Sequence, residues 1–172
     1  MSKPILFDAD VLIHFSKGRA LHLLPLLYPG RICVLDQVRE ELSVGSAARE
    51  WVETQIALGN IQGLALPDRL EVIREYAQLH RRMGRGESAC LALARYDDRY
   101  LASSNLRDIQ SYCRQYNIRF VTTMDVLAQV ERQGIWRENT CDEFIHSIRK
   151  QGSRLPVNSL AEYRNRFEPR KL

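Results

Sequence analysis

The chain contains 172 residues, of which 45% are hydrophobic and 27% are charged, and its formal net charge is +4 at pH 7. This size and composition are typical of one globular domain and argue against disordered and fibrous classes. No apolar run approaches the roughly 18 residues of a membrane helix, and the first residues lack the apolar core of a secretory signal. We therefore expect a cytoplasmic protein with no membrane partner.

The positive charge is concentrated near the end of the sequence. Residues 149–172 contain seven Lys or Arg and two Glu, a surplus of five, so the rest of the chain carries about −1 by subtraction. Such a segment fits a polyanion partner, although a solvated basic tail with no partner is an equal alternative. The four cysteines are far apart and lack zinc-site spacing, so we expect reduced thiols.

Strands and helices are expected to alternate, beginning with a buried strand over 5–7 and a helix over 9–16 that Gly18 ends. The next segment, 20–30, is expected to be a helix interrupted near Pro25. In chain order, the remaining elements are expected to be a strand over 31–36, helices over 37–43 and 46–58, a strand over 61–66, helices over 68–83 and 88–96, a strand over 100–102, a helix over 106–116, a strand over 118–121, and helices over 124–134, 139–150 and 159–167.

This alternation implies an α/β fold in which helices cover both faces of a short parallel sheet. The pattern weakens after Gly134, where an Asn139 or Thr140 cap is expected to begin a further helix. We therefore predict a main domain over residues 1–134 and a basic, helical C-terminal extension over 135–172 that packs on it or follows it.

Acidic residues stand at several junctions between the expected elements. Asp8, the pair Glu40 and Glu41, Glu87 and Asp108 could meet at one edge of a parallel sheet, where such folds bind ligands. Converging carboxylates raise one another's pKa unless a cation lies between them. Mg²⁺ and Mn²⁺ accept oxygen ligands of this kind and can activate a water for phosphodiester hydrolysis. The pattern therefore indicates a divalent metal site.

Five motifs, in order over about residues 5–130, resemble those of PIN-domain nucleases, the family that includes the VapC-type toxins. The stretch "ILFDADVLIHF" resembles the opening strand with its Asp. In "VLDQVREELS", the Glu before Leu selects Glu41 over Glu40. The stretch "RMGRGESACLALA" is similar to a Gly-x-Gly-Glu variant of the third motif and selects Glu87. The stretches "YLASSNLRDIQ" and "NIRFVTTMDVL" resemble the fourth motif and the closing strand and helix.

The resemblance implies a three-layer α/β/α PIN-like fold, often a homodimer, and Mg²⁺- or Mn²⁺-dependent endonucleolytic cleavage of RNA. A small antitoxin should cover the cleft if the chain is a toxin. The implied residue roles are catalysis by Asp8, Glu41, Glu87 and Asp108, metal ligation by Asp8, Glu87, Asn105 and Asp108, support by Asp10, which orients Asp8 or the first helix, and contact of Ser103 and Ser104 with phosphate or with water on the metal.

One residue departs from the family pattern. Asn105 stands where the fourth motif usually has Asp, and Asp108 follows one helical turn later. An Asn carbonyl oxygen can bind a metal but brings no charge. An alternative function is therefore a nucleic-acid- or partner-binding module with weakened metal chemistry.

Structural interpretations of the same residues stay open. Asp8 could cap the first helix, Asp10 could favour its dipole, Glu87 could simply begin a helix, and Asp108 could be a surface residue. Arg81, Arg82 and Arg85 could contact RNA, or they could complement a helix end.

A second enzyme class shares the first motif. Apolar residues followed by Asp-x-Asp also resemble haloacid-dehalogenase-type phosphohydrolases, in which the first Asp is a nucleophile. That family continues with Gly and needs a Gly-Asp signature downstream. Here Val11 and Leu12 follow the pair, and the chain has no Gly-Asp dipeptide.

Overall fold

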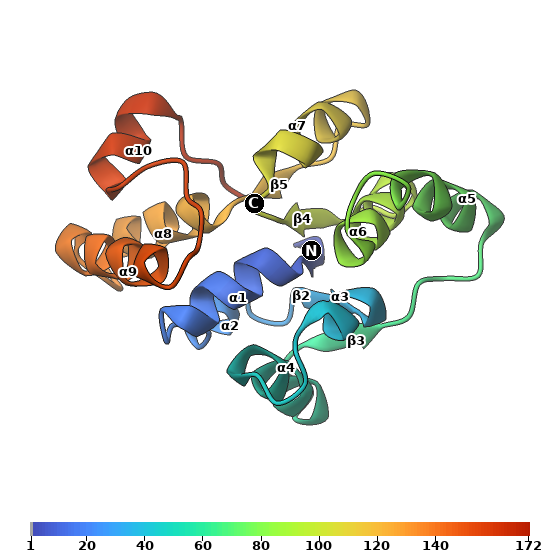
Figure 1. Ribbon diagram of the computed structural model, residues 1–172, viewed down its shortest axis with the longest axis horizontal. Helices are drawn as coiled ribbons and strands as arrows, with labels where there is room; N and C mark the ends of the chain where they lie inside the picture. The colour runs from blue at the N-terminus through green and yellow to red at the C-terminus, as the bar shows by residue number, and fades with distance from the viewer. Residues whose placement is uncertain (1) are drawn as a thin grey trace.

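The protein is described by a computed structural model covering residues 2–172, in which five parallel strands lie among ten helices (Figure 1). The predicted α/β fold with a short parallel sheet is confirmed. The strands are β1 (Ile5–Phe7), β2 (Ile32–Leu35), β3 (Gln62–Leu64), β4 (Tyr100–Ala102) and β5 (Phe120–Val121). The helices are α1 (Ala9–Lys17), α2 (Leu23–Leu27), α3 (Asp36–Glu41), α4 (Ala47–Ala57), α5 (Leu70–Leu79), α6 (Arg85–Tyr96), α7 (Leu106–Gln115), α8 (Thr123–Arg132), α9 (Glu138–Lys150) and α10 (Leu160–Arg166).

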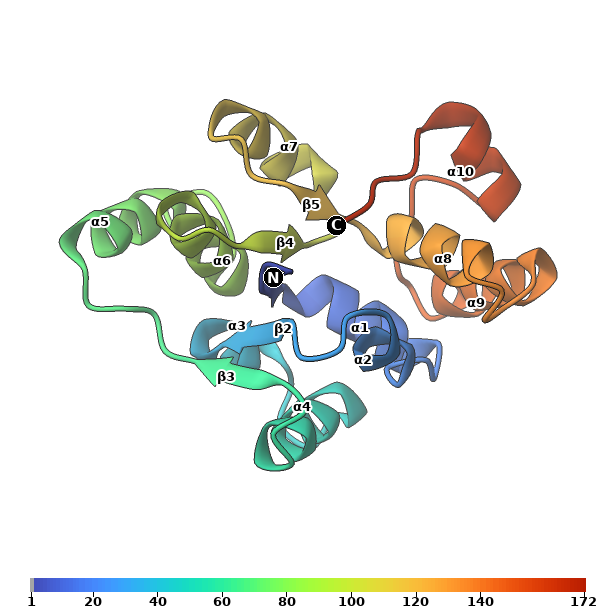
Figure 2. The same cartoon turned by 180° about the vertical axis from the view of Figure 1, so that it is seen from behind.

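The strand order is β3-β2-β1-β4-β5, which Figure 2 shows from behind. The chain adds β2 and β3 on one side of β1 and then crosses to add β4 and β5 on the other. In register, Leu6 of β1 lies beside Cys33 of β2 and Leu101 of β4. The direction of strand addition therefore reverses between β1 and β4, and ligands of open α/β sheets bind at such a point.

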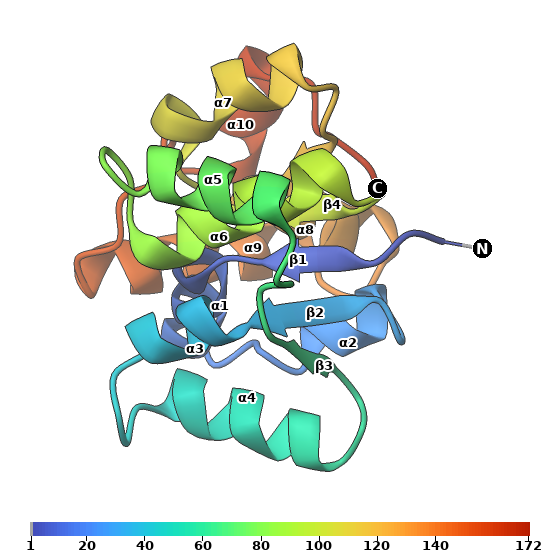
Figure 3. The same ribbon diagram turned by 90° about the vertical axis from the view of Figure 1, so that its right-hand side faces the viewer.

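Helices cover the sheet on two sides. Helices α1, α2, α8 and α9 lie on one side, and α5, α6 and α7 lie on the other (Figure 1). Helix α3 projects beyond the end of β2, at the edge where the strands terminate (Figure 3). All three residues of β1 are fully buried, as expected for a central strand covered on both faces.

Several helix boundaries differ from those expected. Helix α6 begins at Arg85 rather than Ser88, because Gly84 adopts the extended backbone of an N-cap. Gly86 and Glu87 therefore lie inside the first turn. Helix α5 is shorter than 68–83, because the N–H groups of Arg82 and Met83 both turn back to the carbonyl of Leu79.

The expected cap of α9 at Asn139 or Thr140 is wrong. Arg137 has the extended backbone of the N-cap, so both polar residues lie within the helix. Pro25 also does not interrupt α2, because it is the third residue of a five-residue helix. A first-turn residue has no intrahelical partner for its N–H, so Pro is tolerated there.

The two C-terminal helices contact the main body of the protein. Helix α9 packs against α1 and α8, and α10 packs against α8 and α9. A Cβ built on Gly18, at the end of α1, would lie 2.0 Å from a ring carbon of Phe144 in α9. The residue that ends α1 must therefore be glycine for α9 to pack this closely.

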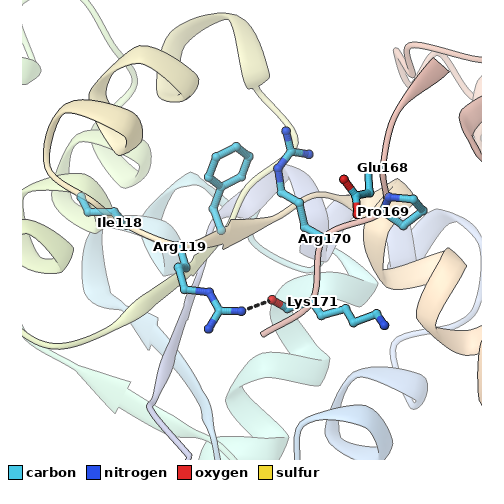
Figure 4. A pocket seen from close by; sticks show the side chains of 7 residues that line it. Ile118, Arg119, Glu168, Pro169, Arg170 and Lys171 are labelled. Carbon is cyan, nitrogen blue, oxygen red and sulfur yellow. Dashed lines mark hydrogen bonds between the residues drawn. The ribbon is translucent and has the colours of Figure 1, made fainter.

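Residues 168–171 continue past α10 and lie beside β5. Together with Ile118, Arg119 and Phe120 they line a cavity of about 390 Å³ (Figure 4). Arg119 donates a hydrogen bond to the backbone carbonyl of Lys171 at 2.6 Å. The Arg170 guanidinium lies over the Phe120 ring, with 4.5 Å between the guanidinium carbon and the ring centroid. These contacts attach the end of the described chain to the sheet edge.

None of the helices in residues 2–172 is long and apolar enough to cross a membrane.

Candidate active site

An open cavity of about 350 Å³ lies at the edge of the sheet where the strands end. Asp8 reaches it from the end of β1, Glu41 from the end of α3, Glu87 from the first turn of α6, and Asn105 from the start of α7. These elements lie on both sides of the point where the strand order reverses. The cavity is lined by Asp8, Ala9, Asp10, Ile13, Glu41, Gly84, Glu87 and Asn105.

Asp8 is 5% exposed and serves as the N-cap of α1. One carboxylate oxygen accepts a hydrogen bond from the Ala9 N–H at 2.8 Å, and the other accepts one from the Ser103 hydroxyl at 3.1 Å. A carboxylate has about four acceptor positions, so both oxygens keep capacity for a further partner. Burial, followed by the charges of Asp10 and Glu87, raises the pKa of Asp8 well above its usual range. The predicted structural role as a cap therefore coexists with a place in the cavity.

Asp10 connects the start of α1 to the loop after β4. Its carboxylate accepts hydrogen bonds from the backbone N–H of Val11 at 2.7 Å and of Ser104 at 2.8 Å. Burial raises the pKa of Asp10 to about 6, against the lowering effect of these backbone N–H groups. Asp10 thus connects the start of the helix to the loop through these two bonds.

The two serines after β4 hold other residues in place. Ser103 is fully buried behind Asp8, so its hydroxyl contacts that carboxylate and has no surface for a phosphate. The Ser104 hydroxyl donates to the Thr123 hydroxyl at 2.7 Å and accepts from the Thr123 N–H at 2.9 Å. The Thr123 hydroxyl also lies 2.8 Å from Nδ1 of His14. These bonds fix the loop that precedes Asn105.

Glu41 is held at the rim by a glycine of the third motif. The N–H of Gly86 donates to Oε1 of Glu41 at 2.8 Å. A Cβ built on Gly86 would lie 2.7 Å from Oε2 of Glu41 and 3.0 Å from a methyl of Val38. Glycine therefore lets the Glu41 carboxylate approach the helix start, where the helix dipole favours negative charge.

Glu87 has the clearest unsatisfied atom in the cavity. The residue is 7% exposed, and its Oε1 has no hydrogen-bond partner within residues 2–172. Burial is the main cause that raises its pKa to about 7, followed by the charges of Asp108 and Asp10. A buried acceptor without a partner is unfavourable, so this oxygen is free to accept a ligand.

Asn105 and Asp108 act as a pair. The Asn105 side-chain amide donates to Oδ2 of Asp108 at 2.7 Å. Asn105 lines the cavity, whereas Asp108 lies one turn further along α7 and lines a neighbouring groove. The structure thus brings Asp8, Glu41, Glu87 and Asn105 together and places Asp108 immediately behind Asn105.

The arginines before α6 lie at the surface. Arg85 forms an ion pair with Glu40 at 2.6 Å, so each of these two residues has the other as its charged partner. Arg81 and Arg82 are exposed in the turn between α5 and α6. Only Arg82 lines the groove that also contains Asp108.

The chemistry of the donors fits a hard divalent cation. Carboxylates and an amide carbonyl are ligands of Mg²⁺ and Mn²⁺, and Glu87, whose buried Oε1 has no hydrogen-bond partner within residues 2–172, lines the same cavity. In residues 2–172, no three His, Cys, Asp or Glu side chains are already arranged to hold a metal ion. Coordination therefore requires side-chain movement.

Sequence reasoning missed several residues of this site. Gly84 and Ile13 line the cavity, Gly86 seats Glu41, and His14 and Thr123 fix the Ser104 loop. The Thr-Thr pair that follows β5 was an available signal, because Thr122 forms a capping box with Asp125 at the start of α8. Nothing in the spacing along the chain indicated the contact of Thr123 with Ser104.

A scan against protein-family models found a match to DUF3368, described as a PIN domain, over residues 4–169. A search of curated proteins found no match. The matched range includes the five strands of the sheet and helices α9 and α10. It also includes the polar residues that line the cavity, which are Asp8, Asp10, Glu41, Glu87 and Asn105. The chain therefore belongs to the PIN-domain family.

Proposed function

We propose that this protein is a divalent-metal-dependent endoribonuclease of the PIN-domain type. PIN domains are generally nuclease domains. The observation that carries the proposal is the convergence of Asp8, Glu41 and Glu87 on one open cavity, with a buried Glu87 oxygen that has no partner in residues 2–172. Such a cavity repels an anionic substrate unless a cation occupies it.

The residues of the cavity have distinct tasks in this proposal. Asp8 and Glu87 would hold Mg²⁺ or Mn²⁺, with the Asn105 carbonyl and Asp108 as further ligands. When bound, the cation would supply Lewis-acid stabilisation of the phosphate and make a water more acidic. Ser103 keeps the Asp8 carboxylate in position through its hydrogen bond at 3.1 Å. Glu41, whose carboxylate accepts a hydrogen bond from the Gly86 N–H, would accept a proton from the attacking water.

A toxin role within a toxin and antitoxin pair is a narrower form of this proposal. Its support is the resemblance to VapC-type toxins, together with an open, acidic cavity that suits a basic side chain of an inhibitor. The expected partners are RNA, a small antitoxin and a second copy of the chain. Growth arrest on induced expression, abolished by Asp8→Asn, is the result expected of a toxin.

A second candidate function rests on Asn105. Asn105 stands where the motif usually has Asp, so the fourth motif supplies one negative charge fewer than usual, and its amide donates to Asp108. A nucleic-acid-binding module that has lost turnover would fit this arrangement. The phosphohydrolase alternative has less support, because Asp10 is bound by two backbone N–H groups and is not free to act as a general acid.

Cleavage of labelled single-stranded RNA in Mn²⁺, Mg²⁺ or EDTA tests the proposal. We expect cleavage in the presence of either ion and none in EDTA or with Asp8→Asn. The variant Asn105→Asp restores the usual charge and should increase cleavage. Well-folded protein that binds RNA in EDTA and never cleaves it, even as Asn105→Asp, would favour the binding module instead.

A further inference from the structure

A polar groove of about 400 Å³ lies next to the candidate active site, between the turn that precedes α6 and one face of α7. Arg82 and Met83 form one wall. The other wall is a stripe of α7 residues spaced by helical turns, from Arg107 and Asp108 at one end to Gln115 at the other. The groove is lined by Arg82, Met83, Arg107, Asp108, Ser111, Tyr112 and Gln115.

The groove and the candidate active site share one boundary. Asp108 lines the groove, and it accepts the hydrogen bond from Asn105, which lines the active-site cavity. Gly84 of the cavity lies two residues from Arg82 of the groove. From Arg107 to Gln115 the stripe spans eight helical steps of about 1.5 Å each, or about 12 Å. A molecule that extends from the cavity along α7 would therefore enter this groove.

The two arginines are available for an anionic ligand. Arg82 and Arg107 are both exposed, and within residues 2–172 neither guanidinium forms an ion pair or a hydrogen bond. Arg85 differs, because it is paired with Glu40 at 2.6 Å. With Asp108 as the acidic residue of the lining, the groove carries a net positive charge beside a cavity rich in carboxylates.

The remaining lining residues suit a sugar-phosphate chain rather than an apolar ligand. Ser111 and Gln115 are exposed and offer a hydroxyl and an amide. Tyr112 is buried, and its hydroxyl donates to Glu75 at 2.6 Å, so its ring forms a fixed floor. No large exposed apolar side chain lines the groove, which argues against a protein helix as the occupant.

We propose that this groove binds the phosphates of a single-stranded polynucleotide that flank the bond cleaved in the neighbouring cavity. The inference rests on the proposed nuclease function, because the cavity defines where the cleaved bond lies. A phosphodiester that approaches Asp8, Glu41 and Glu87 is repelled by them. The guanidinium groups of Arg82 and Arg107 attract the adjoining phosphates and so offset this repulsion.

Fluorescence anisotropy of labelled decanucleotides, in EDTA and in the Asp8→Asn background, measures binding without turnover. We compare Arg82→Ala, Arg107→Ala and the double variant, each over 50 to 200 mM salt. Loss of one phosphate contact should reduce the slope of log K against log salt by about 0.7, and the double variant by about 1.4. Arg107→Lys should retain the slope. RNA and DNA oligonucleotides are measured side by side, and binding of either one through the groove supports the proposal and identifies the sugar.

The matched control is Arg132→Ala, which also removes one positive charge. Arg132 is the last residue of α8, whereas the contact of this helix with Ser104 is made by Thr123 at its first residue. Its slope should equal that of the Asp8→Asn parent. A double groove variant with the slope of the Arg132 control would overturn the inference. This result is independent of the nuclease proposal, because cleavage of RNA by the unaltered protein is measured separately.

Discussion

At the scale of single residues, the cavity contains groups whose ionised forms are disfavoured. Asp8, Asp10 and Glu87 each have a raised pKa, with burial as the largest cause. Active sites are where such shifts concentrate, because groups with a function are placed where burial opposes their charge. The same feature makes the site a source of instability when it has no bound cation.

We expect Glu87→Gln to stabilise the protein in EDTA at pH 8. The pKa of Glu87 is raised from 4.5 to about 7, so the folded state binds more protons than the unfolded state between these values. Stability due to this group therefore falls as pH rises from 4.5 to 7, and the cost above pH 7 is on the order of 1 to 3 kcal/mol. Urea unfolding at pH 5 and pH 8 measures the difference. Glu50→Gln on the exposed face of α4 is the control, and a gap that does not widen with pH would contradict the expectation.

The contribution of His14 to stability changes with pH in the opposite direction to that of Glu87. Burial lowers the pKa of His14 from 6.5 to about 4, so the unfolded state takes up a proton first as pH falls. The contribution of His14 to stability is complete above pH 6.5 and is lost as pH falls toward 4. Relative to His14→Gln, wild type should lose about 2 kcal/mol between pH 7 and pH 5. Urea unfolding of wild type and His14→Gln at pH 7 and pH 5 measures this loss, with the exposed His146→Gln as control. A difference in the free energy of unfolding that is the same at both pH values would refute the expectation.

At the scale of elements, the start of α8 connects the chain end to the site. Asp125 in its first turn has a fully buried side chain. Its carboxylate accepts hydrogen bonds from the Tyr163 hydroxyl at 2.7 Å, the Arg170 N–H at 2.8 Å and the Thr122 N–H at 2.9 Å. Thr123, the first residue of α8, contacts Ser104 beside the cavity. One short helix end therefore joins α10, the last residues and the active-site loop.

The ion pair of Arg170 with Asp125 should stabilise this junction. The guanidinium lies 3.3 Å from Oδ2 of Asp125. Arg170→Ala leaves a buried carboxylate without its cation and should lower the free energy of unfolding by about 2 kcal/mol. Thermal or urea unfolding measures the change, with the exposed Lys171→Ala as control. In an Asp125→Asn background the same substitution should cost much less, and equal costs in both backgrounds would show that the pair is not coupled.

At the scale of the whole molecule, the basic segment 149–172 has a structural use. Several of its arginines contact other parts of the chain: Arg149 donates to the backbone carbonyls of Leu155 and Val157, and Arg164 pairs with Glu131 and Glu138. Arg170 binds Asp125 in the same way. Two of these arginines, Arg164 and Arg170, thus attach the C-terminal segment to α8. Arg82 and Arg107, whose guanidinium groups form no ion pair within residues 2–172, lie instead before α6 and on α7.

Metal binding should stabilise the entire fold, because the proposed ligands come from the ends and starts of β1, α6 and α7 and meet only in the folded state. Mn²⁺ at 100 times its dissociation constant should add about 2.7 kcal/mol to the free energy of unfolding. A titration followed by thermal unfolding measures this, and KCl of equal ionic strength is the control. Asp8→Asn should abolish the increase. An equal increase in that variant would place the metal elsewhere.

The amino-acid sequence by itself determined the class of fold and the identity of the carboxylates in the cavity. Apolar segments with period two or period 3.6 specify strands and helices locally, and short motifs follow them at strand ends, so Asp8, Glu41 and Glu87 could be named in advance. Boundaries were less accurate where a long-range bond replaces a local signal, as at Gly86, whose N–H binds Glu41.

Only the tertiary structure decided how these residues contact one another. Thr123 reaches Ser104, Arg170 reaches Asp125, and Arg82 faces Arg107, across 19, 45 and 25 residues of sequence. Such pairs are set by the strand order and by helix packing, which combine many weak contacts from distant segments. No local pattern of charge or hydrophobicity contains that information, so the groove along α7 and the attachment of the basic segment became visible only in the folded chain.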